Sequence, residues 1–222
     1  MKTTEEELML IYQKLYKAFG PRGWWPGDTP FEIIVGAILT QNTSWENVEK
    51  AITKMKAYKL LSPDKLNDVE ESILAEAIRP SGYYNIKAKR LKRFTDFLFH
   101  EYEGDLSLMF YQGLNELRTR LLSVNGIGPE TADSILLYAG DKPIFVVDAY
   151  TRRIFSRHNL INATTNYHET QDLFMKNLPK DVELFNEYHA LIVHLGKNFC
   201  KRTPKCADCP LFAPDFIPES LQ

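Results

Sequence analysis

The sequence lacks the features that mark secreted and membrane-spanning proteins. Its 222 residues include three cysteines, an odd number gathered near the end of the chain, which does not fit a disulfide-stapled scaffold. No apolar run approaches the roughly 20 residues that a membrane-spanning helix needs. Residues 1–7 have neither the basic start nor the apolar run of a signal peptide. With 44% apolar and 25% charged residues, wholesale disorder is excluded too. We expect a soluble intracellular protein of one large or two small domains.

The chain has no large excess of charge of one sign, because it contains 27 Lys and Arg and 29 Asp and Glu, a formal net charge of −2. The charges are nevertheless segregated. A first basic strip, residues 79–93, holds six basic side chains and no acidic one, and a second basic strip, residues 197–205, holds four and again none. Such strips can bind a polyanion locally, although each could also be a solvated helix face.

Strand signals are scarce, and the apolar periodicity is helical nearly everywhere. Phe31–Leu39 is almost wholly apolar, Thr43–Glu46 fits a capping box, and Ser62-Pro63 is typical of a helix start. The one strand-like run, Ile144–Val147, is short and has no partner with which to pair. The sequence therefore predicts an all-α fold.

Two glycines separated by one apolar residue, Gly126-Ile127-Gly128, lie between two helical patterns. Such a turn lets backbone N–H groups approach a phosphate, and the next helix offers its positive N-terminal end. Ile127 is the expected apolar plug between the helices. The stretch, continued by Thr131, resembles the helix-hairpin-helix motif, which binds the DNA backbone without reading sequence. The alternative is an ordinary Gly-rich connection between helices.

Asp148 follows the apolar run and opens another helical pattern, which by itself fits a simple N-cap. Together with the hairpin, with Leu39–Thr43 and with the late cysteines, it resembles the helix-hairpin-helix DNA glycosylases of the endonuclease III superfamily. That resemblance implies a two-lobed all-helical fold. One lobe, residues 24–130, would be a helical barrel ending in the hairpin, and residues 1–23 plus 131–222 would form the other. It also implies a monomer that acts on double-stranded DNA near the nucleoid in the cytoplasm.

The resemblance implies a reaction, hydrolysis of the N-glycosidic bond of a damaged, everted nucleotide. Asp148 would be the catalytic carboxylate that stabilises the oxocarbenium-like sugar and orients or deprotonates the attacking water. Gln41 would fill the gap left in the duplex, with a helix-end Gln as the alternative. The family loop-helix that grips the DNA backbone maps to Ser81–Asn85, followed by Lys87, Lys89 and Arg90 as phosphate contacts. The alternative is that these cations only solubilise the helix.

Glu130 departs from the endonuclease III pattern. Bifunctional members carry a lysine two residues after the second hairpin glycine, where it forms a Schiff base with the sugar. Because a carboxylate cannot form a Schiff base, the sequence predicts a monofunctional glycosylase. The alternatives are a bifunctional endonuclease III-like glycosylase and AP lyase, and a non-catalytic DNA-binding module.

Tryptophans lie near the predicted position of Gln41 and suggest aromatic walls for a cationic, alkylated purine such as 3-methyladenine. Core packing is the alternative for each of them. The chain resembles the MagIII-type branch of 3-methyladenine glycosylases, whose members also carry Glu at the lysine position, in Trp24–Pro26, in Leu39–Thr43 and in residues 79–91. The residues expected to line the base pocket are Trp24, Trp25, Pro26, Trp45 and Glu130.

Cys200, Cys206 and Cys209 are spaced closely enough to suggest a metal or cluster site. The resemblance implies a [4Fe–4S] cluster whose fourth cysteine is replaced by Asp215, with a zinc site or a metal-free loop as alternatives. It also implies a monovalent cation held by main-chain carbonyls of the hairpin, at Leu122, Val124 and Ile127. His189 and His194 show no ligand spacing and are predicted to be packed or at the surface.

Overall fold

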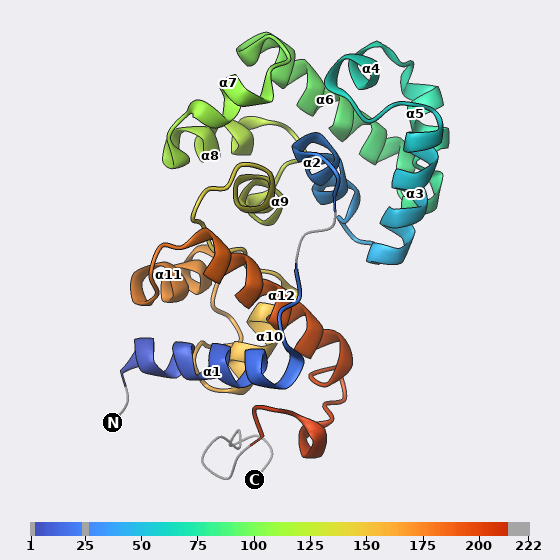
Figure 1. Cartoon of the computed structure of the whole chain (residues 1–222). Coiled ribbons are helices and arrows are strands. Elements are labelled where there is room, and N and C mark those ends of the chain that lie inside the picture. Colours follow the sequence, from blue (N-terminus) through green and yellow to red (C-terminus); the bar gives the residue numbers. More distant parts are fainter. Residues whose placement is uncertain (1–2, 24–26, 213–222) are drawn as a thin grey trace. The chain divides into compact units, whose positions relative to one another are not determined.

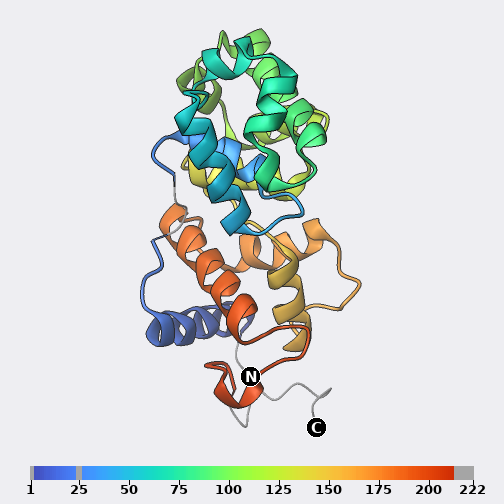
Figure 2. The ribbon, with the colours of Figure 1, turned by 90° about the vertical axis from the view of Figure 1, so that its right-hand side faces the viewer.

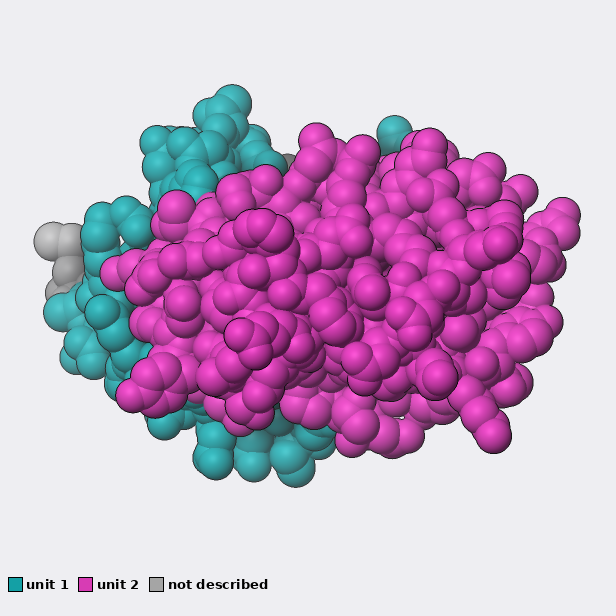
Figure 3. All heavy atoms as spheres, turned by 90° about the horizontal axis from the view of Figure 1, so that it is seen from above, with its two compact units in different colours: residues 1–25, 143–222 teal, residues 26–142 magenta. Residues whose placement is uncertain are grey.

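The computed structural model describes residues 3–23 and 27–212, and within these ranges it contains helices but no strand. The chain divides into two compact units, residues 1–25 with 143–222 and residues 26–142, which Figure 3 shows in different colours. The prediction of an all-α fold is confirmed. Among the described residues, no helix combines the length and apolar character that crossing a bilayer requires.

The unit of residues 26–142 is built around one apolar helix. This helix, α2 (Pro30–Leu39), is buried along nearly its whole length and packs against α3, α6, α9 and the π-helical segment η2 (Figure 1). Its start is fixed by Thr29, whose hydroxyl accepts a hydrogen bond from the backbone N–H of Glu32, and by Pro30 in the first turn. The other helical elements of this unit are α3 (Trp45–Ala57), α4 (Pro63–Asp68), α5 (Glu71–Ala77), η1 (Arg79–Ser81), α6 (Tyr84–Tyr102), α7 (Leu106–Tyr111), α8 (Leu114–Ser123), α9 (Pro129–Ser134) and η2 (Ile135–Ala139).

The unit of residues 1–25 and 143–222 has a core of aromatic rings. Phe145 and Phe174 stack with ring centroids 3.8 Å apart, and Tyr188 packs edge-on against both. The Tyr188 hydroxyl donates to the carbonyl of Leu8, so the first helix is tied to the last long one. Figures 1 and 2 show α12 beside α1 and α10. The helices are α1 (Thr4–Phe19), α10 (Ala149–Arg157), α11 (Tyr167–Asn177), α12 (Val182–Asn198) and the short η3 (Cys206–Asp208).

Three local expectations meet different outcomes. The Ser62 side chain caps α4 as predicted. The expected Thr43–Glu46 capping box is not formed, because the N-cap of α3 is Ser44, whose side chain makes no capping hydrogen bond. The run at residues 144–147 is extended and buried but belongs to no sheet. Residues 131–142 pack in the unit of residues 26–142 rather than with the following chain, because η2 lies against α2. Along the chain, the boundary between the units therefore lies between residues 142 and 143, whereas residue 131 was expected.

Candidate functional site

Asp148 occupies the N-cap of α10 and is held there by Thr151. One carboxylate oxygen, Oδ1, accepts hydrogen bonds from the Thr151 backbone N–H at 2.7 Å and from its hydroxyl at 2.9 Å. The Thr151 hydroxyl in turn accepts from the Asp148 N–H at 3.4 Å, which completes a capping box. The side chain is 11% exposed. The local sequence therefore fixes the carboxylate in one orientation.

The second oxygen of Asp148, Oδ2, faces a histidine from α12. It lies 3.7 Å from Nε2 of His189, whose side chain is 5% exposed. Burial raises the pKa of the Asp148 carboxyl, but His189 and the bonds from Thr151 outweigh it, and the net pKa lies below the ordinary value. Asp148 is therefore a buried group that stays ionised at neutral pH.

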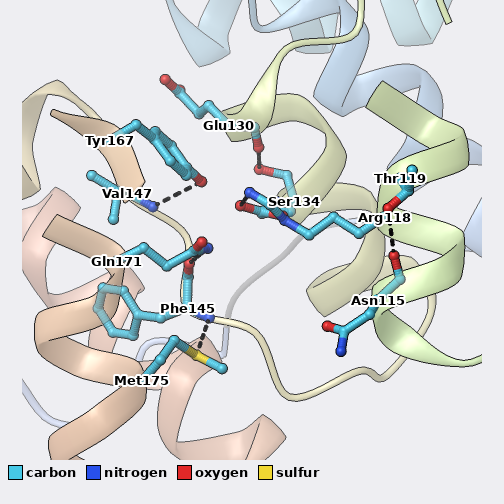
Figure 4. A network of polar contacts seen from close by, with 11 residues as sticks. Asn115, Arg118, Thr119, Glu130, Ser134, Phe145, Val147, Tyr167, Gln171 and Met175 are labelled. Carbon is cyan, nitrogen blue, oxygen red and sulfur yellow. Dashed lines mark hydrogen bonds and ion pairs between the residues drawn. The ribbon is translucent and has the colours of Figure 1, made fainter. Parts of the chain in front are cut away.

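Side chains of α11 hold the extended segment that leads into Asp148 (Figure 4). The Gln171 amide donates to the carbonyl of Phe145 at 2.7 Å, and the N–H of Phe145 points to the sulfur of Met175 at 3.3 Å. The N–H of Val147 donates to the Tyr167 hydroxyl at 3.4 Å. These contacts take the place of a neighbouring strand, and so fix the point at which α10 begins.

Close packing of α10 on α12 brings Asp148 and His189 together. Tyr150 lies directly over Gly196, where a Cβ atom would overlap the ring. The guanidinium of Arg153 stacks on the Tyr150 ring, 4.9 Å from its centroid, and donates to the carbonyls of Gly196 and Cys200. Any side chain larger than hydrogen at position 196 would push the two helices apart.

The predicted hairpin is present as α8, a tight turn and α9. Gly126 has φ +100°, and a Cβ there would lie 2.5 Å from Cγ of Arg90, so glycine is needed for both conformation and space. Gly128 has φ −93° and open space where a Cβ would be. Ile127 is 5% exposed and buried in this unit, as expected of a plug. Neither the backbone conformation nor the packing therefore requires glycine at position 128.

Gln41, just after α2, is bound to this hairpin. Its amide nitrogen donates to the carbonyl of Gly126 at 3.0 Å and to the Thr131 hydroxyl at 2.9 Å. Its amide oxygen accepts from the guanidinium of Arg90. The α2 terminus, the hairpin turn and α6 thus share one polar cluster, which we call the Gln41 cluster: Gln41, Arg90, Gly126 and Thr131.

A buried ion pair joins the two hairpin helices. Nε of Arg118 lies 2.7 Å from Oδ1 of Asp133, and Nη2 lies 3.1 Å from Oδ2. Asp133 is fully buried and Arg118 is 18% exposed. This two-point contact fixes the angle between α8 and α9.

The side chains of the first basic strip, residues 79–93, do not all lie at the surface. Lys87, expected to face a phosphate, is 1% exposed and donates to the carbonyls of Leu39 and Ser81 at 2.8 and 2.6 Å. Burial, and then the charge of Arg90, lower its pKa to about 8. Lys89 is exposed, whereas Arg90 belongs to the Gln41 cluster. We therefore leave Lys87 out of any DNA-binding surface.

The residues expected to line a base pocket are only partly described. Trp24, Trp25 and Pro26 lie outside the described residues. Trp45 is half-buried at the start of α3, and its indole N–H donates to Glu49 at 2.7 Å. Glu130 is exposed on the first turn of α9, and its backbone carbonyl accepts from the Ser134 hydroxyl. The position of the Schiff-base lysine is thus filled by an accessible carboxylate.

The segment after α12 that carries Cys200, Cys206 and Cys209, which we call the cysteine loop, is bound by Arg157. The Arg157 guanidinium lies 3.2 Å from Sγ of Cys200 and donates to the carbonyls of Lys201 and Arg202. Burial raises the pKa of the Cys209 thiol, and the other two cysteines raise it further. Within the described part of the chain, no three Cys, His, Asp or Glu side chains form a set that could hold a metal ion, and Asp215 lies outside it. The described residues do not fit a cluster, and iron and sulfide analysis of protein purified without oxygen tests this directly.

Sequence reasoning missed several residues that shape the site. His189 was expected to be packed or exposed, and it is packed, but against the Asp148 carboxylate. The sequence carries a signal for Thr151, because Asp148-x-x-Thr151 has capping-box spacing. Lys87 shares a helical stripe with the buried Leu91, Phe94 and Leu98, which is a signal for its burial.

Comparison with known proteins places the chain in a family. The family model described as "HhH-GPD superfamily base excision DNA repair protein" matches residues 35–180. The chain is 50% identical over 214 residues to a protein of Methanocaldococcus jannaschii named "Putative DNA repair glycosylase MJ1434", covering 95% of this chain and 97% of that one.

Solved structures agree with the family match. The chain is 32% identical to the Helicobacter pylori 3-methyladenine DNA glycosylase MagIII bound to 1,N6-ethenoadenine, with a TM-score of 0.75 over 88% of this chain and 98% of that one. It shares the fold of an endonuclease III trapped as a covalent intermediate with DNA, with a TM-score of 0.80 at 24% identity over 95% of this chain and 94% of that one. The chain therefore belongs to the HhH-GPD superfamily of base excision DNA repair proteins.

Proposed function

We propose that this chain is a monofunctional DNA glycosylase that hydrolyses the N-glycosidic bond of an alkylated purine, with 3-methyladenine as the representative substrate. The observation that carries the proposal is the state of Asp148, a buried carboxylate whose pKa is lowered by His189 and Thr151 against the opposing effect of burial. A fixed negative charge of low solvent exposure is what a developing oxocarbenium ion needs. The partner is double-stranded DNA with a damaged base, bound by a monomer in the cytoplasm.

The chemistry follows from the charges. The C1′–N bond breaks with its electron pair leaving on the base, which alkylation has already made cationic, so the base departs neutral. Positive charge develops on the sugar and is stabilised by the Asp148 carboxylate. A water oxygen then bonds to C1′, and its proton passes to the carboxylate.

Glu130 supports the monofunctional assignment. An amine at this position would attack C1′ and form a Schiff base, but a carboxylate cannot. The relative with 3-methyladenine activity, at 32% identity over most of the chain, supports the choice of substrate class. Alkylated purines are also cations that stack well on indole rings, and we assign this stacking to Trp24, Trp25 and Trp45, beside Pro26.

The hairpin is the proposed grip on the DNA backbone. The backbone N–H groups of Gly126 and Gly128, with Thr131 on α9, are the proposed phosphate contacts, and open space where a Cβ would be at Gly128 allows a close approach there. Carbonyls of Leu122, Val124 and Ile127 would hold a monovalent cation on the same turn. Lys89 and Arg90 add positive charge from α6.

Gln41 is proposed to fill the gap that the everted nucleotide leaves. Its amide is bound to Gly126, Thr131 and Arg90 in the free protein, so insertion into DNA requires these bonds to be exchanged. Such an exchange of hydrogen bonds has a small net free energy, since each lost bond is replaced by one to a base or to water.

A base-release assay tests the proposal. Duplexes carrying 3-methyladenine, 7-methylguanine, a deaminated purine or an oxidised pyrimidine are incubated with excess protein, and released bases are quantified. We expect release of an alkylated purine, and a loss of about 10²–10⁴-fold with Asp148→Asn, since asparagine still caps the helix but carries no charge. Asp181→Asn, at the exposed N-cap of α12, is the matched control.

Two outcomes would contradict the proposal. A covalent complex trapped with borohydride would indicate a bifunctional enzyme and exclude the direct attack of water. DNA binding with no release of any base by the unaltered protein would indicate a non-catalytic DNA-binding module.

A further inference from the structure

The two oxygens of the Asp148 carboxylate have different surroundings. Oδ1 receives both donors of Thr151, the N–H and the hydroxyl. Oδ2 receives neither, and 3.7 Å away lies Nε2 of His189. At this separation both the N–H and the charge of the imidazole favour the ionised carboxylate. Oδ2 is thus the oxygen that can take a new partner.

Other charged groups on the neighbouring elements are directed elsewhere. On α10, Arg152 is exposed, Arg153 donates to the carbonyls of Gly196 and Cys200, and Arg157 donates to carbonyls of the cysteine loop. On α12, Glu187 accepts the backbone N–H of Arg22. On α11, the Tyr167 hydroxyl accepts the N–H of Val147. His189 is therefore the titratable group that faces Oδ2.

We propose that His189 is a positioning residue for base excision, and that its imidazole keeps the Asp148 carboxylate ionised with Oδ2 open to the sugar and the attacking water. The inference rests on the proposed role of Asp148. Burial alone favours the neutral form of a carboxyl, which cannot stabilise a cation, so the ionised form depends on the partners of Asp148.

Histidine suits this position better than a longer cation. Lysine or arginine could reach Oδ2 and form a close, hydrogen-bonded ion pair. Such a pair would neutralise the carboxylate charge that the sugar cation needs. The imidazole is short and rigid and is held in the packed face of α12, between the buried Tyr188 and Ala190. It thus favours the ionised carboxylate without occupying its free oxygen.

The test is a titration that needs no substrate. Protein labelled with ¹³C at aspartate carboxyls is titrated by NMR, and the Asp148 signal is assigned by its absence in Asp148→Asn. We expect His189→Phe to raise the midpoint of this signal by about one pH unit, the lower end of what a neighbouring charge contributes. His189→Gln, which keeps a donor at a similar reach, should restore part of the shift.

Base release completes the test. With His189→Phe, the fall of the single-turnover rate on acidification should begin about one pH unit higher than in the unaltered protein, in step with the protonation of Asp148. His194→Phe is the matched control, since it makes the same change on the same helix and keeps the ring contact with Phe19.

The outcomes separate this inference from the function on which it rests. An Asp148 midpoint that is the same in the unaltered protein and in His189→Phe overturns it, as does a shifted midpoint with an unchanged pH profile of base release. Failure of the proposed function would instead be seen as no base release by the unaltered protein, and the titration would still report on the pair.

Discussion

Replacing the buried Lys87 with methionine tests how the chain tolerates a charge inside the unit of residues 26–142. Lys87 is 1% exposed, and its ammonium donates to the carbonyls of Leu39 and Ser81. Leu39 ends α2 just before Gln41, so the amine caps the helix that presents this side chain. Lys87→Met keeps a chain of similar length and removes the titrating group.

The magnitude follows from the pKa. Burial, with a smaller contribution from Arg90, lowers the pKa of Lys87 from 10.5 to about 8. Between these values the unfolded chain binds more protons than the folded one, so the free energy of unfolding rises with pH. The full shift corresponds to about 3 kcal/mol, of which about 2.5 kcal/mol is gained between about pH 7 and about pH 10. At neutral pH we expect a small net change, because removal of a buried charge offsets two carbonyls left without a donor.

Urea denaturation at several pH values measures the effect. The stability of the unaltered protein relative to Lys87→Met should rise by about 2.5 kcal/mol between about pH 7 and about pH 10. Lys89→Met removes the same charge from the exposed side of α6 and controls for the change in net charge. A difference between the unaltered protein and Lys87→Met that stays constant with pH would refute the reasoning.

The hairpin offers two further predictions. Arg118→Met removes the two-point contact to the fully buried Asp133 carboxylate, so the free energy of unfolding is expected to fall by about 3–5 kcal/mol in urea denaturation. Much of the loss should return in the double variant with Asp133→Leu, and a single-variant loss below about 1 kcal/mol would contradict a buried pair. Gly126→Ala is expected to lower the free energy of unfolding by about 1–3 kcal/mol, because Gly126 has a positive φ and lies against the Arg90 side chain. Gly128→Ala should keep the stability of the unaltered protein but bind duplex DNA more weakly in fluorescence anisotropy. The reverse order of stabilities would show that the glycine assignments are wrong.

Local patterns made much of the fold predictable. The apolar run Phe31–Leu39, the cap at Ser62 and the hairpin glycines are all set by neighbours in sequence, and each lies where it was expected. Burial of Lys87 depends on carbonyls at the ends of two other elements, which no periodicity specifies. In the same way, Asp148 was predicted as a carboxylate at a helix start, but its pairing with His189 requires the packing of α10 on α12.

The extended segment before Asp148 has a consequence for protein engineering. Its backbone is held by Tyr167, Gln171 and Met175, which come later in the chain, on α11. A transplant of the Asp148 loop and α10 into another helical scaffold would leave Phe145 and Val147 without these partners. A portable version of this carboxylate therefore has to include α11, so that the smallest graft extends from the segment through that helix.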